Sequence, residues 1–169
     1  MGIDDVDYSQ EEWAASAGHR PLKDRNAEDL HLLHRHWMWA NQIREAFDQA
    51  LREGPSRDLP PPPLMLASKS IGFMLVWYAM LWAVIEACTD PKERRLVDIR
   101  GRFRQDIDVM SPTLRDCRNA IFHVPRNGQI LDDRISAFVV ETAATTVHRV
   151  SRGFGRLFLE ELKSRIAAS

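Results

Sequence analysis

The sequence predicts an all-α fold, an antiparallel bundle of about five helices preceded by an irregular acidic N-terminal arm. Apolar side chains recur every three or four positions through long segments, whereas no segment shows the strict alternation typical of a strand. Gly-Pro and Ser-Pro pairs separate these periodic segments. A chain of 169 residues is long enough for one domain with its own core. We place the arm at residues 1–26 and a single helical domain at 27–169.

The first half of the domain contains two predicted helices and a stiff connection. One helix is expected over 27–53 and ends at a Gly-Pro pair. The segment 54–63 includes four consecutive prolines at 60–63, which favours an extended spacer. The next helix, over 64–87, is apolar nearly all round and should be the central core element. The stripe that the first helix should bury is Leu30, Leu33, Trp37, Ile43, Phe47 and Leu51.

The next segments predict two shorter helices with a break between them. A helical stretch is expected over 92–108, with an interruption near Gly101 as an alternative. Ser111 is a good N-cap and Pro112 suits the first helical position. This pair therefore predicts a fresh helix over 113–124, which stops at the following proline.

The last predicted helix is long and runs over 132–166. Gly153 and Gly155 are the positions where this helix would kink, and they follow no strand, so they do not form a phosphate-binding loop. Its expected inner stripe is Ile135, Phe138, Val139, Thr142, Thr146, Val150, Phe154 and Phe158.

The charge is unevenly distributed although the net charge is only −1. Residues 1–30 carry eight acidic and three basic side chains, and residues 91–126 carry nine basic and five acidic ones. A near-neutral total excludes a uniformly basic coat but allows a local nucleic-acid site. The basic residues of this stretch are mostly arginine, which suits bidentate phosphate contacts, although a solvated helix face has the same composition. Folding of the acidic arm over this stretch as an RNA mimic is a further possibility.

Neither a membrane location nor secretion is expected. The longest apolar run, 71–85, has fifteen residues, fewer than the roughly 20 that span a bilayer. The acidic N-terminus lacks the basic and apolar regions of a secretory signal. Cys88 and Cys117 form neither a disulfide framework nor a zinc-binding pattern. We therefore expect a cytoplasmic protein with reduced thiols.

The densest group of chemically useful side chains lies on the helix predicted at 113–124. By helical geometry Asp116, Asn119 and His123 lie within about 60° of one direction. The long side chain of Arg118 can reach the same polar face, and Leu114, Cys117, Ile121 and Val124 form the opposing apolar stripe. An imidazole beside a guanidinium is suited to cleavage of a phosphodiester. A partly buried histidine with a capping aspartate is the plainer interpretation of the same residues.

The segment Arg118-Asn119-Ala120-Ile121-Phe122-His123 resembles the R-N-x-x-x-H form of the motif of HEPN (higher eukaryotes and prokaryotes nucleotide-binding) domains. The resemblance covers residues 27–166 and implies a helical bundle that forms a symmetric homodimer, with both motif helices lining one cleft. Many members of this family are metal-independent endoribonucleases of toxin–antitoxin or phage-defence systems, so no cofactor is expected, and an antitoxin or defence partner is implied.

The resemblance also implies roles for individual residues. Arg118 would stabilise the scissile phosphate, His123 would act as general acid and base, and Asn119 would orient either of them. Glu86, at the end of the apolar helix, is a looser match to an acid that holds the arginine, and a solvated helix end is the alternative. We expect Asp116 to help orient the motif side chains. We expect the RNA strand to be bound by Arg102, Arg104 and Arg115.

Two further features leave alternatives open. Five tryptophans (Trp13, Trp37, Trp39, Trp77 and Trp82) are many for a small bundle and favour an interface, although a core role explains Trp37, Trp77 and Trp82 equally well. His31 and His34 share a helix face, but His36 points away, so a polar surface is a better interpretation than a metal site. Beside the endoribonuclease, we consider a non-catalytic nucleotide- or RNA-binding module and a purely structural interaction protein.

Overall fold

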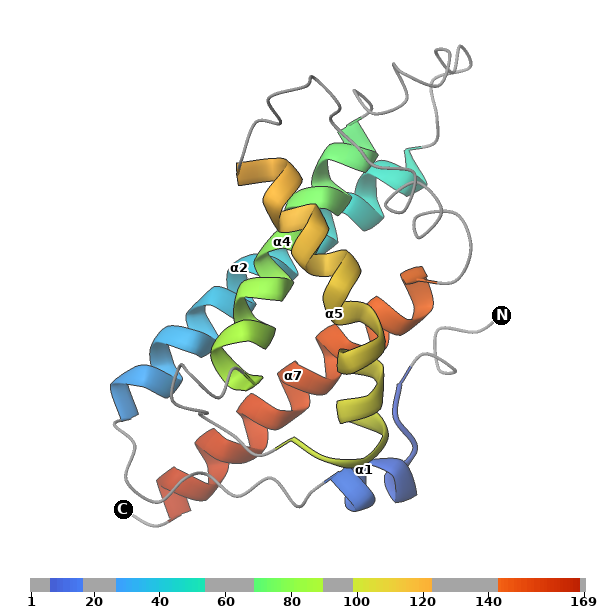
Figure 1. Cartoon of the computed structure of the whole chain (residues 1–169). Helices are drawn as coiled ribbons and strands as arrows, with labels where there is room; N and C mark the ends of the chain where they lie inside the picture. Colours follow the sequence, from blue (N-terminus) through green and yellow to red (C-terminus); the bar gives the residue numbers. More distant parts are fainter. Residues whose placement is uncertain (1–6, 17–26, 54–68, 90–98, 123–142, 168–169) are drawn as a thin grey trace.

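A computed structural model of the chain describes residues 7–16, 27–53, 69–89, 99–122 and 143–167. Within these ranges the chain is all-helical, with five helices and no strand, so the predicted all-α bundle is confirmed. The connection expected over 54–63 lies outside the described residues. The helices, labelled as in Figure 1, are α1 (Gln10–Ser16), α2 (Ala27–Arg52), α4 (Lys69–Thr89), α5 (Gly101–Phe122) and α7 (Ala143–Ala167).

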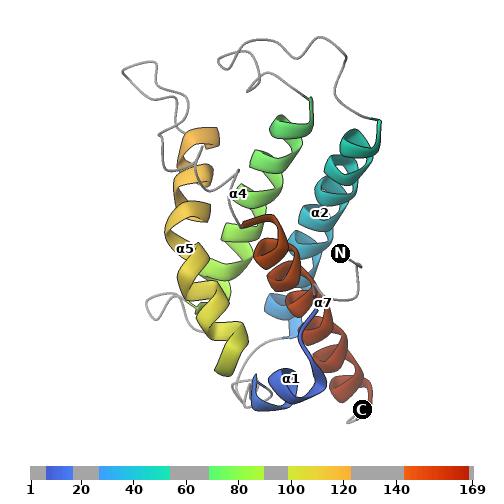
Figure 2. The same ribbon diagram turned by 90° about the vertical axis from the view of Figure 1, so that its right-hand side faces the viewer.

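Helix α4 lies between α2 and α5 and contacts both of them extensively (Figure 2). The three helices run in alternating directions, and α7 crosses them on one side of the bundle (Figure 1). The short helix α1 lies against the first half of α5, close to α7 (Figures 1 and 2). The core is therefore built around α4 and is closed by α7.

Helix α4 is the central core helix, as its composition predicts. Trp77, Leu81, Val84, Ile85 and Cys88 are fully buried, because nearly every face of the helix meets a neighbour. Among the described residues, α4 is the one helix long and apolar enough to cross a membrane, and half of that apolar stretch is buried inside the bundle. A core helix of a soluble protein has these same properties.

Helix α2 closely matches the predicted helix over 27–53, with one exception in its buried stripe. Leu30, Leu33 and Phe47 are buried, and Trp37 and Ile43 pack partly against the core. Leu51 was expected in this stripe but is 55% exposed. It lies in the last turn of the helix, next to the buried Ala50.

Helix α5 corrects the predicted break at residues 108–113. One helix runs continuously from Gly101 to Phe122 and contains Pro112 in its interior. Ser111 is not an N-cap, since its hydroxyl donates to the carbonyl of Ile107 at 2.6 Å. Pro112 is exposed, and it costs the helix the one backbone hydrogen bond that an N–H at this position would donate to the Asp108 carbonyl. Burial of the apolar stripe of α5 outweighs this local signal for a helix start. The stripe consists of Phe103, Ile107, Met110, Leu114 and Cys117.

The sequence allows an interruption near Gly101 as an alternative, and α5 begins at this residue. Gly101 has a φ of 62°, in the left-handed region that side chains rarely adopt. The remainder of the helix predicted over 92–108 lies outside the described residues, except for Ile99, which is buried, and Arg100.

Helix α7 runs through Gly153 and Gly155 without interruption, so neither glycine ends the helix. Both glycines serve close packing. A Cβ added to Gly155 would lie 2.6 Å from the Trp37 ring, and one added to Gly153 would lie 2.9 Å from the Phe103 and Tyr8 rings. Val150, Phe154 and Phe158 are fully buried, as predicted, whereas the stripe residues before 143 lie outside the described part of the chain.

Helix α1 corrects the expectation of an irregular N-terminal arm. A capping box begins this helix: the Ser9 hydroxyl accepts from the Glu12 amide at 3.1 Å, and the Glu12 carboxylate accepts from the Ser9 amide at 3.0 Å. Tyr8 and Trp13 are each only 4% exposed. Residues 7–16 are thus part of the packed molecule, because their two aromatic rings complete the core beside Phe103.

Candidate functional site

The motif residues Arg118 and Asn119 lie near the end of α5, where they meet Glu86 of α4. The Arg118 guanidinium donates to the Asn119 side-chain oxygen at 3.0 Å, and its Nη2 lies 4.0 Å from the Glu86 carboxylate. The side chains of Arg118 and Glu86 are 38% and 36% exposed. The structure therefore brings three of the predicted site residues together in a cluster that solvent can reach.

The two helices place this cluster through their buried residues. Leu114 and Cys117 are fully buried, and Ile121 packs partly against the core, as the predicted apolar stripe requires. Arg118 follows Cys117 and so lies at the border between the core and the surface. Glu86 follows the buried Ile85 of α4. Each charged group thus has an aliphatic stem near the core and a charged end in solvent.

The other candidate residues of the motif are placed differently. His123 directly follows the last described residue of α5 in the sequence and lies outside the described residues. Asp116 is half-buried and leaves the helix about 160° away from Arg118, so it belongs to another face. Burial, reinforced by the Asp116 carboxylate, raises the pKa of the Cys117 thiol to about 12. Cys117 is therefore an inert core residue at neutral pH.

The three arginines expected to bind RNA divide into two groups. Arg115 is exposed and precedes Arg118 by one helical turn, so it extends the cluster. Arg102 and Arg104 lie near the start of α5, about 21–24 Å along the helix from Arg118. They form ion pairs with Asp106 at 3.1 Å and with Asp108 at 2.9 Å, respectively. They are thus remote from the motif and already paired with carboxylates.

A buried cluster around Asp106 is absent from the sequence prediction. The Asp106 carboxylate accepts from the Tyr8 hydroxyl at 3.0 Å and pairs with Arg149 at 2.7 Å and with Arg102 at 3.1 Å. Burial, with the carboxylate as the second cause, raises the pKa of the Tyr8 hydroxyl. A paired and hydrogen-bonded buried carboxylate joins the segment before α1 to α5 and α7, which is a structural role.

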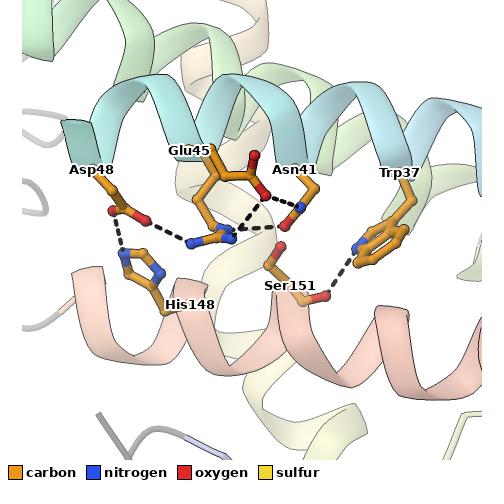
Figure 3. Close-up of polar contacts among 7 residues, drawn as sticks. Trp37, Asn41, Glu45, Asp48, His148 and Ser151 are labelled. Atoms are coloured by element: carbon orange, nitrogen blue, oxygen red, sulfur yellow. Dashed lines mark hydrogen bonds and ion pairs between the residues drawn. The ribbon is translucent and has the colours of Figure 1, made fainter. Parts of the chain in front are cut away.

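A second polar cluster joins α2 to α7 (Figure 3). His148 Nε2 lies 3.8 Å from Asp48 Oδ1, and Arg44 donates to the same carboxylate at 2.6 Å. The His148 ring also packs on Trp77, with 4.7 Å between the ring centroids. Burial lowers the pKa of His148, although Asp48 opposes that shift. The imidazole is therefore neutral at pH 7 and serves packing between the helices.

Ser151 lies one turn beyond His148 but does not complete a nucleophilic site. It is 1% exposed, so no substrate can reach its hydroxyl, which has no hydrogen-bond partner within the described ranges. Its carbonyl accepts from the Trp37 indole at 2.9 Å (Figure 3).

Two of the three histidines of α2, His34 and His36, pack against aromatic rings. The His34 ring stacks on Trp37 at 5.8 Å, and burial lowers the pKa of His34. His36 donates to the Leu32 carbonyl at 2.8 Å and meets the Trp39 ring edge at 5.2 Å. Over the described residues, no group of three His, Cys, Asp or Glu side chains could hold a metal ion.

The tryptophans divide between core and surface. Trp13 and Trp77 are buried, Trp37 and Trp82 pack partly against the core, and Trp39 is 45% exposed. A core role thus applies to four of the five.

Compared with protein-family models, curated proteins and solved structures, the chain matches none of them. The functional argument therefore depends on the side chains of this chain.

Proposed function

We propose that this protein is a HEPN-type, metal-independent endoribonuclease that acts as a homodimer in a toxin–antitoxin or phage-defence system. The observation that supports this proposal best is the Arg118 guanidinium, which Asn119 and Glu86 hold at the surface on the helix that carries the R-N-x-x-x-H sequence. A fixed cation that solvent can reach is the group that a charged phosphoryl transition state needs.

In the proposed reaction the RNA 2′-hydroxyl attacks the adjacent phosphorus. His123 acts as general base and accepts the proton from this hydroxyl. The imidazolium form of His123 acts as general acid and protonates the departing 5′-oxygen. The P–O5′ bond breaks as the new P–O2′ bond forms, which leaves a 2′,3′-cyclic phosphate and a 5′-hydroxyl. Arg118 stabilises the extra negative charge on the phosphoryl oxygens, and Asn119 and Glu86 keep its guanidinium in place.

The proposal places the two Arg118–His123 pairs of a dimer in one shared cleft. Arg115, exposed one turn before Arg118, adds positive charge at this end of α5 for an RNA strand. Because both thiols are buried and reduced thiols are typical of the cytoplasm, we propose that the protein acts there, under the control of an antitoxin or defence partner.

Labelled RNA incubated with the purified protein in EDTA tests the proposal. We expect the wild type to cleave, and we expect Arg118→Ala and His123→Ala each to lower the rate by about 10²–10⁴-fold. Arg52→Ala and His31→Ala serve as matched controls, because they remove an exposed arginine and an exposed histidine from α2. Both variants should cleave like the wild type.

Two outcomes would overturn the proposal. Intact RNA with the wild-type protein would exclude cleavage, and tight RNA or nucleotide binding in that case would favour the non-catalytic binding module. Undiminished cleavage by both motif variants would mean that other residues perform the reaction.

A further inference from the structure

Phe122 is the most exposed aromatic residue of the described chain. Its side chain is 63% exposed, although it lies in the last turn of a helix whose other phenylalanine, Phe103, is fully buried. Phe122 directly precedes His123 in the sequence. A large apolar ring that remains in water beside a candidate site suggests a binding role.

No ring or cation of the described residues lies on this ring, unlike on the other exposed aromatic residue. Trp39 is 45% exposed, but the Arg35 guanidinium lies 5.4 Å from its ring centroid and the His36 ring lies 5.2 Å away. Among the residues that the structure describes, neither a cation nor another ring contacts Phe122. Within the described ranges, no ring or cation would have to move for a flat ligand to stack on Phe122.

The neighbours of Phe122 on the helix are arginines. Arg118 and Arg115 precede it by four and seven residues, so all three side chains lie along one face of α5. Arg115 is exposed, and Arg118 is 38% exposed. An open aromatic ring combined with guanidinium groups is the pattern that binds single-stranded nucleic acid, where the bases stack and the cations hold phosphates.

Charge complementarity favours RNA over a second copy of the chain on this ring. RNA supplies phosphates opposite Arg115 and Arg118. Packing of this patch directly on its copy, with no RNA in the shared cleft, would instead leave these arginines facing one another without a counter-charge.

We propose that Phe122 is the platform on which one base of a single-stranded RNA stacks, with Arg115 holding a neighbouring phosphate. The proposal rests on the proposed RNA-directed function and extends it, because it assigns the base-contacting residue beside the reacting phosphate. Stacking selects flat bases and unpaired strands rather than a particular sequence.

Binding of a fluorescently labelled RNA oligonucleotide to the full-length His123→Ala protein, measured by anisotropy, tests this inference without cleavage. Phe122→Leu keeps an apolar side chain but removes the stacking surface, so we expect binding about 5- to 150-fold weaker. Phe122→Tyr keeps the ring and should bind like the parent. Thermal unfolding should be nearly unchanged in both variants, since the side chain is exposed.

The salt dependence of RNA binding distinguishes base stacking by Phe122 from phosphate binding by Arg115. Arg115→Ala should reduce the slope of log affinity against log salt by about 0.7 for one lost phosphate contact. Phe122→Leu should weaken binding with no change in this slope, and Arg52→Ala should change neither quantity.

Three results would overturn the inference: equal binding by Phe122→Leu, no RNA binding by the parent, or a dimer that dissociates in Phe122→Leu, which would assign the ring to the second copy. The proposed function is tested separately by the wild-type protein. Cleavage that does not depend on Phe122 would overturn only the inference. Binding that depends on Phe122 without cleavage by the wild type would support the inference and overturn only the endoribonuclease.

Discussion

Arg118 is positioned by weak interactions rather than by burial. Its carboxylate partner Glu86 lies 4.0 Å away, and both side chains are more than one third exposed. Exposed ion pairs of this kind stabilise a fold by about 0–1 kcal/mol. The Glu86–Arg118 contact therefore adds little to stability, and in the proposed function its role is to orient the guanidinium.

This assignment predicts the effect of Glu86→Gln on the proposed reaction. Loss of the charge removes up to about 1 kcal/mol of the ion-pair energy that orients Arg118, so cleavage should slow by up to about fivefold. We expect the loss in kcat, with KM and the free energy of unfolding almost unchanged, because Glu86 does not contact RNA in the proposal. A loss of stability with normal kcat would instead assign Glu86 to packing.

His148 predicts a pH dependence of stability. Burial lowers its pKa below the usual 6.5, so between these two values the unfolded chain binds more protons than the folded one. This contribution to stability is present above pH 6.5 and is lost as the pH falls toward the lowered pKa. Titration by NMR should place the pKa of His148 below 6.5, and Asp48→Asn should lower it further, since Asp48 favours the charged ring. A value above 6.5 would contradict this account.

Single residues could be predicted from the sequence where helical periodicity determines their surroundings. The buried positions of Leu114 and Cys117, and hence the border position of Arg118, follow from a spacing of three to four residues. Asp106 could not be predicted, because its partners Tyr8 and Arg149 lie 98 and 43 residues away in the sequence. Its ion pair with Arg102, four residues earlier, looks like an ordinary surface pair in the sequence.

At the scale of helices, the contact between α2 and α7 depends on the absence of a side chain at Gly155. A Cβ there would lie 2.6 Å from the rigid Trp37 ring, whereas one at Gly72 in α4 would meet nothing within 4 Å. We expect Gly155→Ala to destabilise the protein by about 1–3 kcal/mol through overpacking. Gly72→Ala should stabilise it by about 1 kcal/mol, because alanine favours a helix. Chemical denaturation measures the change in the free energy of unfolding for each variant. Equal changes at the two sites would exclude a packing role for Gly155.

Helix existence was easier to predict than helix boundaries. The long periodic segments of α2 and α4 correspond to helices in the structure. Ser111 and Pro112 carry a true local signal for a helix start, but the apolar stripe from Phe103 to Cys117 packs as one continuous face. For α1, the acidic composition obscured a signal that was present, the Ser-x-x-Glu capping box before Trp13.

At the scale of the whole molecule, residues 7–16 are part of the core. The Trp13 indole donates to Glu160 of α7 at 2.9 Å, and Tyr8 donates to the buried Asp106. An RNA-mimicking arm would have to come from residues outside this range, since Tyr8 and Trp13 are buried against α5 and α7.

The proposed composite cleft requires a stable dimer. Light scattering of the purified protein should give a mass near twice 19.5 kDa. Arg118→Ala should remain dimeric, because the proposal gives Arg118 a role toward phosphate rather than toward its partner. A monomeric wild type that still cleaves RNA would contradict the shared cleft.

The most direct test of the central claim is the chemistry of the cleaved ends. RNA treated with the wild-type protein in EDTA should yield fragments with 2′,3′-cyclic phosphate and 5′-hydroxyl ends by mass spectrometry, and His123→Ala should yield none. Fragments with 5′-phosphate ends, or RNA that stays intact unless a divalent metal is supplied, would contradict a metal-independent attack by the 2′-hydroxyl.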